Sequence, residues 1–126
     1  MDSTTNSLNW FEIPALDIDR SKKFYETVFD LEMISHEMGE MKMAMFPFSP
    51  GSGKANGGIA QSPQHKPSVE GTVIYLNANP AMDDVVARVE AAGGKVLLPK
   101  MDIGENGFMA MILDTEGNSI GIHSTS

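Results

Sequence analysis

The sequence predicts an α+β domain made of two similar halves, each with the element order strand, helix, strand, strand, strand. Short segments with apolar residues at every second position, typical of strands, alternate with two longer segments whose apolar residues are three and four positions apart, typical of helices. Short sequences of the first half recur in the second half in the same order. The 126 residues and the hydrophobic content of 41% fit one globular domain over residues 1–126.

The first half is expected to cover residues 8–61. Alternation over its first strand places Phe11 and Ile13 on one face. Asp17 is the predicted N-cap of the following helix, because its carboxylate can accept hydrogen bonds from the first turn. The expected elements are a strand at 8–13, a helix at 18–30, and strands at 31–35, 41–48 and 58–61.

A polar connector, residues 62–71, leads to the second half, residues 72–124. Asn79 is the predicted cap of the second helix and Pro80 its first residue, since proline suits the first helical position. Glycine tolerates the left-handed conformation that follows a last turn, so Gly93 is expected to end this helix. Strands are expected at 72–77, 95–98, 107–113 and 119–123.

Four pairs of segments correspond between the halves: Ile13 with Leu76, 30–33 with 93–96, 43–46 with 109–112, and 56–60 with 117–121. Each helix is expected to cover one face of its first strand. The other face then carries Trp10 and Glu12 in the first half, and Val73 and Tyr75 in the second. Two such faces turned inward form a concave, mostly apolar cleft, which is a common kind of ligand site.

Composition excludes several kinds of function. The chain has no cysteine, which excludes disulfides, thiolate zinc sites and a cysteine nucleophile. Nine basic residues are scattered among seventeen acidic ones, and the net charge of −8 predicts neither nucleic acid nor a membrane surface as a partner. No apolar run reaches the length of a membrane span. The first seven residues contain no basic region or apolar run, so we expect no signal peptide and a cytoplasmic protein.

Three groups of residues are typical of one family: Phe11-Glu12-Ile13-Pro14 with 17–21 and Phe24-Tyr25, then 92–94, then the acidic turn and closing strand of 113–121. With these segments the chain resembles the vicinal oxygen chelate superfamily, which includes glyoxalase I, bleomycin-resistance proteins and extradiol dioxygenases. The resemblance runs from about residue 8 to residue 124. It implies a fold of paired βαβββ modules and a homodimer.

Metal-dependent members of this family hold a divalent ion on the first and fourth strands of each module. The resemblance places these four positions on Trp10, Ala60 (or its neighbour Ile59), Val73 and Gly121. None of these side chains can ligate a divalent metal. We therefore expect no cofactor, and a metal only if displaced residues bind it.

Glu12 and His123 are the candidate catalytic residues, because each lies two positions beyond one of these sites and should face the same cleft. A buried carboxylate beside an imidazole can act as an acid–base pair or as half of a displaced metal site. The alternative is a purely structural polar pair. His36 and His65 lie in or beside predicted loops and are expected to be solvated.

Aromatic and thioether side chains are the candidate ligand contacts, since methionine adapts to irregular apolar ligands and aromatic rings stack on aromatic guests. The alternative is that they belong to the core. The expected cleft lining is Trp10, Tyr75, Met43, Met45, Met109, Met111 and Gly121.

The resulting hypothesis is a metal-free member of this superfamily that binds a small, partly apolar or aromatic molecule between its modules. The rival hypothesis is a glyoxalase-like lyase or isomerase of the lactoylglutathione lyase type, with a divalent metal at displaced ligands such as Glu12 and His123. A third hypothesis is a cleft that only a partner chain completes.

Overall fold

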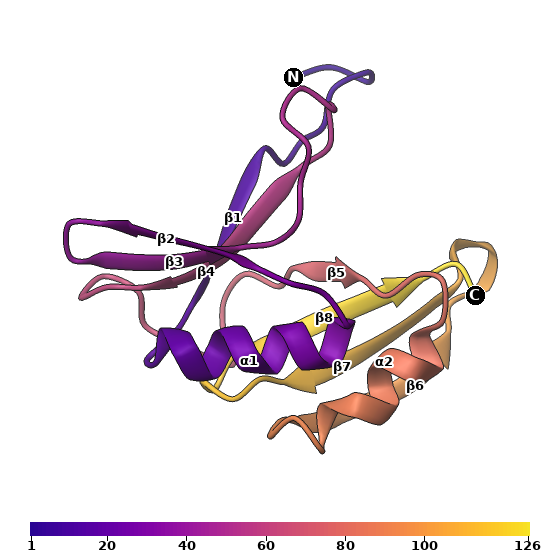
Figure 1. The fold of residues 1–126 in the computed structure, drawn as a ribbon. Coiled ribbons are helices and arrows are strands. Elements are labelled where there is room, and N and C mark those ends of the chain that lie inside the picture. The colour runs from indigo at the N-terminus through magenta and orange to yellow at the C-terminus, as the bar shows by residue number, and fades with distance from the viewer.

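The computed structural model describes residues 1–126 and contains two four-stranded sheets, each covered by one α-helix (Figure 1). The first half comprises β1 (Trp10–Pro14), α1 (Ile18–Phe29), β2 (Ile34–Met38), β3 (Met41–Met45) and β4 (Asn56–Gln61). The second half comprises β5 (Tyr75–Asn77), α2 (Met82–Val89), β6 (Lys95–Asp102), a 3-10 helix (Gly104–Asn106), β7 (Phe108–Leu113) and β8 (Ser119–Ser124). The predicted α+β class and element order are confirmed. Neither α-helix has the length and apolar character needed to cross a lipid bilayer.

The two sheets have the same topology. Their strand orders are β1-β4-β3-β2 and β5-β8-β7-β6, with a parallel pair at one edge and antiparallel pairs elsewhere. In the first sheet Glu12 is in register with Gly58, and in the second Tyr75 is in register with Gly121. Both members of the second pair lie 63 residues beyond those of the first, so one offset relates both parallel edges.

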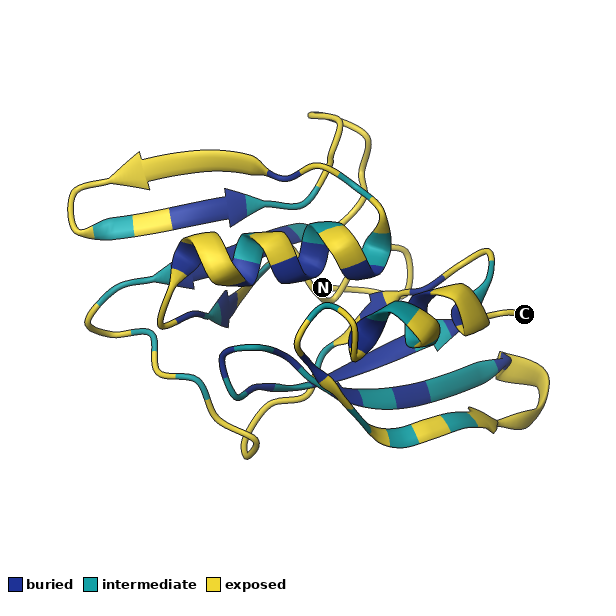
Figure 2. Cartoon of the chain, turned by 60° about the horizontal axis from the view of Figure 1, so that its bottom comes forward, coloured by how far each residue is buried: buried dark blue, intermediate teal, exposed yellow.

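The core lies between the helices and the sheets and continues across the two halves. It includes Ile13 of β1 and Leu76 of β5, with Val28 and Val89 from the two helices. Buried positions on α1 and α2 alternate with exposed ones along each helix (Figure 2). The helices also contact each other, where Arg88 Nε donates to the carbonyl of Val28 at 2.9 Å. The opposite face of each sheet is therefore left uncovered by helix.

The second strand begins later than the predicted residues 31–35. Helix α1 ends at Asp30, which takes a left-handed conformation with φ of 51°. The next residues complete this helix end, because the backbone N–H of Leu31 donates to the Glu26 carbonyl and that of Met33 to the Glu26 carboxylate. Residues that cap a helix cannot also pair in a sheet. Strand β2 therefore starts at Ile34 and includes His36, which the sequence placed in or beside a loop.

The predicted cap of the second helix was wrong. Ala81 is the N-cap of α2 and makes no side-chain hydrogen bond to the first turn. Asn79 instead accepts hydrogen bonds through Oδ1 from the Ser124 hydroxyl and from the backbone N–H of Thr125. The C-terminal segment, 45 residues away, thus takes the side chain that local pattern assigned to the helix.

Candidate functional site

Strand β1 supplies the first two residues of the candidate site. Phe11 and Ile13 turn toward the core, so the period of two places Trp10 and Glu12 on the uncovered face. The indole Nε1 of Trp10 donates to Glu12 Oε2 at 3.1 Å. The other carboxylate oxygen, Oε1, lies 2.8 Å from Nε2 of His65, which belongs to the connector between the halves.

His65 is held on both sides of its ring. Its Nδ1 lies 2.6 Å from the Ser62 hydroxyl, and its Nε2 contacts Glu12. The hydrogen bond from His65 is the largest cause that holds the pKa of Glu12 below its ordinary value, with burial opposing it and the bond from Trp10 adding to it. Glu12 is therefore an ionised carboxylate near neutral pH.

A hollow of about 360 Å³ lies on the uncovered face of the first sheet beside this pair. Three of its thioethers come from alternate positions of β3, where the intervening Ala44 is in the core, and the fourth, Met38, comes from β2. This hollow, here called the methionine hollow, is lined by Trp10, Glu12, His36, Met38, Met41, Met43 and Met45.

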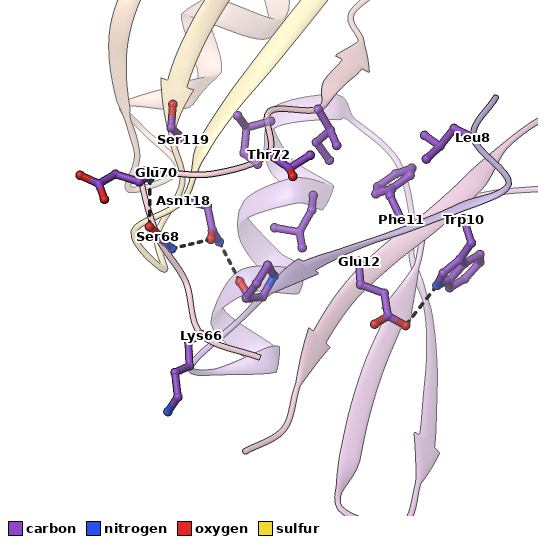
Figure 3. Close-up of a pocket in the computed structure, with 14 residues that line it drawn as sticks. Leu8, Trp10, Phe11, Glu12, Lys66, Ser68, Glu70, Thr72, Asn118 and Ser119 are labelled. Carbon is purple, nitrogen blue, oxygen red and sulfur yellow. Dashed lines mark hydrogen bonds between the residues drawn. The ribbon is translucent and has the colours of Figure 1, made fainter. Parts of the chain in front are cut away.

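A second cavity, of about 420 Å³, separates the two halves along the free edge of β1 (Figure 3). Trp10 and Glu12 line it from one side, and the connector and the start of β8 line it from the other, with Ser68 and Ser119 among the contacts. Asn118 closes one end, since its Nδ2 donates to the carbonyl of Pro14 and its Oδ1 accepts from the backbone of Ser68. Trp10 and Glu12 thus belong to both this inter-module cleft and the methionine hollow.

The uncovered face of the second sheet carries a separate hollow of about 590 Å³. Tyr75, Met109 and His123 line it together with residues of the 3-10 helix region. The ring of Tyr75 lies over Gly121, where a Cβ would come within 2.5 Å of the ring. Met111 is partly buried and in register with Gly121.

Five of the seven expected cleft residues fall into two groups, and Met111 and Gly121 line neither hollow. Trp10, Met43 and Met45 lie together in the methionine hollow. Tyr75 and Met109 lie in the hollow of the second sheet. Each group is on the side of its sheet that is away from the helix, whereas the sequence leaves cleft and core open for the methionines.

The expected pairing of Glu12 with His123 was wrong. The imidazole of His123 contacts the carbonyl of Asn106 at 2.7 Å, within its own half. The histidine beside Glu12 is His65, which the sequence predicted to be solvated. The reason is tertiary, because the connector folds back over β1 and brings together residues 53 positions apart. The only local signal was the spacing of Ser62 and His65, which indicates a turn but not what the turn touches.

The family's metal positions do not suit a divalent ion here. Trp10, Ala60, Val73 and Gly121 offer no ligating side-chain atom, and no three His, Asp or Glu side chains come together elsewhere. The register also corrects one correspondence. The structural counterpart of Gly121 is Gly58 rather than Ala60, and a glycine there ligates no better.

Residues 7–122 match the Glyoxalase/Bleomycin resistance protein/Dioxygenase superfamily. "Putative glyoxylase CFP32" of Mycobacterium tuberculosis is 33% identical over 121 residues, which are 90% of this chain but 44% of that protein. A "Glyoxylase-like domain-containing protein" of Didymella fabae is 30% identical over 122 residues, 91% of each chain. The chain thus spans less than half of the mycobacterial relative.

Among solved structures, the trypanothione-dependent glyoxalase I of Leishmania major superimposes with a TM-score of 0.70 at 16% identity. The superposition covers 96% of this chain and 88% of the Leishmania chain, and at that identity it shows the fold alone. The match over residues 7–122 and the curated relatives show that this chain belongs to the Glyoxalase/Bleomycin resistance protein/Dioxygenase superfamily.

Proposed function

We propose that this chain binds a small, partly apolar or aromatic molecule along β1, between the inter-module cleft and the methionine hollow, and that this binding needs no metal. The observation that supports this most directly is that Trp10 and Glu12 line both cavities. A ligand at this shared rim contacts an aromatic ring and an ionised carboxylate at the same time.

The apolar part of the binding comes from Trp10 and the methionines. The Trp10 side chain is 40% exposed in the free chain, so a ligand can remove apolar surface from water there. Stacking on an aromatic guest adds about 0.5–1.5 kcal/mol beyond that burial. The thioethers of Met43 and Met45 supply a wall that adapts to irregular shapes.

The polar part comes from Glu12. Each of its oxygens accepts one hydrogen bond within the chain. A carboxylate oxygen has room for two, so a donor group on the ligand can be accommodated without displacing Trp10 or His65. This favours ligands that carry an N–H or O–H group beside their apolar part.

The fluorescence of Trp10 tests this proposal, because it is the single tryptophan of the chain. A panel of aromatic amines and phenols is titrated against Trp10 emission. We expect saturable quenching by at least one member, weakened about tenfold in Met45→Ala, which corresponds to about 1.4 kcal/mol. Met111→Ala, at the matching position of the second sheet, is the control and should leave the affinity unchanged. Absence of saturable quenching across the panel, or equal loss in both variants, would overturn the proposal.

A glyoxalase-like lyase or isomerase is the second candidate, favoured by the contact of Glu12 with His65 and by the names of the curated relatives. A carboxylate and an imidazole at hydrogen-bonding distance can move a proton at a carbon beside a carbonyl. The test is turnover of a hemithioacetal with added Ni²⁺ or Zn²⁺. Metal-dependent activity that Glu12→Gln abolishes would favour this candidate over simple binding.

We also propose that the chain is a homodimer, as the family resemblance implies. Tyr75, on the uncovered face of the second sheet, is 51% exposed, and a second copy covering it would bury this ring. Sedimentation velocity at micromolar concentration should give the mass of a dimer. Monomer alone would contradict this expectation.

A further inference from the structure

The methionine hollow contains soft ligand atoms as well as apolar surface. Ten methionines and no cysteine make thioethers the only sulfur ligands of the chain. We propose that the hairpin of β2 and β3 binds one soft monovalent metal ion, Cu(I) in the cell, between the thioethers of Met38, Met41 and Met43 and the imidazole of His36. This metal site does not depend on the proposed aromatic ligand.

The strand register brings these four side chains to one face. His36 is paired with Met43, and Met38 with Met41. All four line the same hollow, so they occupy the corners of a rectangle on the sheet. Its sides are about 4.5–5.5 Å across the strands and about 6.8 Å along them.

Such a rectangle is small enough for convergent ligands. A point above its centre lies within about 5 Å of every Cβ, given those spacings. The methionine sulfur lies two bonds beyond Cβ on a side chain with three rotatable bonds. The thioethers can therefore turn toward one ion, and Met38, at 59% exposure, has open space to do so.

The chemistry of these ligands selects the metal. Thioethers suit Cu(I), and imidazole suits copper, whereas Mg²⁺ and Ca²⁺ take oxygen ligands. Four neutral ligands leave the ion with its positive charge. Glu12 lines the same hollow, and its carboxylate, within a chain of net charge −8, favours a cation there.

The second sheet offers a contrast that strengthens the assignment. Met109 is in register with both His123 and Met101, so the same residue types are present there. The imidazole of His123, however, is already hydrogen-bonded to Asn106. His36 makes no side-chain hydrogen bond and is free to ligate.

Titration with Ag(I), which has the same charge and soft character, tests the site without redox chemistry. The protein is labelled with ¹³C-methyl methionine, so that NMR follows each methionine during the Ag(I) titration. The affinity for Cu(I) is measured separately, by competition with a chromophoric chelator under reducing conditions. We expect binding of one ion, with the largest methyl shifts at Met38, Met41 and Met43. The double variant Met41→Leu/Met43→Leu should lower the affinity at least 100-fold.

Leucine conserves volume and apolar character, so the variant removes two sulfur ligands while the hairpin keeps its apolar packing. The exposed single variant Met38→Leu, which risks no core residue, should lower the Ag(I) affinity about tenfold. The control Met109→Leu/Met111→Leu should change it less than threefold.

Two results would overturn the metal site. One is the absence of methyl shifts at one equivalent of Ag(I). The other is equal loss of affinity in the control and in the β3 double variant. Failure of the aromatic panel alone would overturn only the proposed function, because the Ag(I) titration does not use it.

Discussion

The two halves of the chain share a backbone plan but differ at equivalent positions of their uncovered faces. Glu12 in the first sheet corresponds to Tyr75 in the second, and each is in register with a glycine, Gly58 or Gly121. In the first half the face carries an ionised carboxylate bound by Trp10 and by a histidine of the connector. In the second half it carries a phenol ring over glycine.

The difference shows that the same backbone topology can carry different side-chain chemistry at equivalent strand positions. The carboxylate of Glu12 contacts Trp10 on its own strand and His65 from the connector outside its sheet. The second half supplies the contact that joins the two halves. Its acidic turn, residues 114–118, reaches the start of α1 through Glu116.

The largest expected effect comes from breaking that link. The Glu116 side chain is fully buried and accepts from Arg20 at 2.7 Å and from the backbone N–H groups of Leu16 and Asp17. The variant Glu116→Ala leaves these donors without an acceptor. It should lower the free energy of unfolding by about 2–3 kcal/mol. Urea denaturation measures it. Ser52→Ala, in the exposed loop of the first half, is the control and should lie within about 0.5 kcal/mol of the parent.

The same residue makes the link sensitive to acid. Burial raises the pKa of Glu116, but the hydrogen bonds from Arg20 and from the surrounding donors outweigh it and hold the pKa below its ordinary value of 4.5. Its stabilisation is therefore complete above pH 4.5 and is lost as the pH falls through the folded-state pKa. The difference in stability between parent and Glu116→Gln should shrink with acid over that range. A constant difference would contradict this account.

The two matched glycines should respond unequally to a methyl group. A Cβ at Gly58 would lie 2.4 Å from the backbone carbonyl oxygen of Ala44, whereas at Gly121 it would meet the ring of Tyr75, which is half exposed and can move. Gly58→Ala should destabilise by about 2 kcal/mol and Gly121→Ala by less than about 1 kcal/mol. Thermal unfolding compares them. Equal losses would mean that the Tyr75 ring is as fixed as backbone.

The two α-helices differ in their N-caps, and a substitution can add a cap to one or remove it from the other. Asp17 caps α1 by accepting from the N–H groups of Asp19 and Arg20, while Ala81 at the start of α2 caps nothing. Ala81 has the extended conformation that a capping residue needs. Ala81→Asp should stabilise the chain by about 0.5–1 kcal/mol, and Asp17→Ala should destabilise it by about 1 kcal/mol. A loss of stability in Ala81→Asp would show that the site cannot use a cap.

The smallest effect concerns Glu12 and is seen by fluorescence rather than by stability. Because the hydrogen bond from His65 lowers the pKa of Glu12, the contact with Trp10 should persist until the pH falls below the ordinary value of 4.5. Trp10 emission should change with a midpoint below that pH in the parent. Glu12→Gln should abolish the transition, and its persistence in this variant would assign it to another group.

Much of the fold was predictable because it depends on local periodicity. The apolar spacing of α1 and the alternation of β1 and β3 depend only on residues that are close in the sequence. The alternation of β1 correctly placed Ile13 in the core and Trp10 outside it. The boundaries were less predictable. The start of β2 depends on Glu26, whose carboxylate takes the backbone of Met33, and the cap of α2 depends on Ser124 and Thr125 at the other end of the chain.

By itself the sequence determined the two-part plan, the family and the face of β1 on which Glu12 lies, because a period of two or of 3.6 residues assigns faces without knowledge of distant contacts. Only the tertiary structure decided that Glu12 meets His65 rather than His123, and that Trp10, Met43 and Met45 line one hollow while Tyr75 and Met109 line another. The reason is physical. A side chain's partner depends on how a connector with no periodicity of its own folds back over the strand, and no neighbouring residue encodes that path.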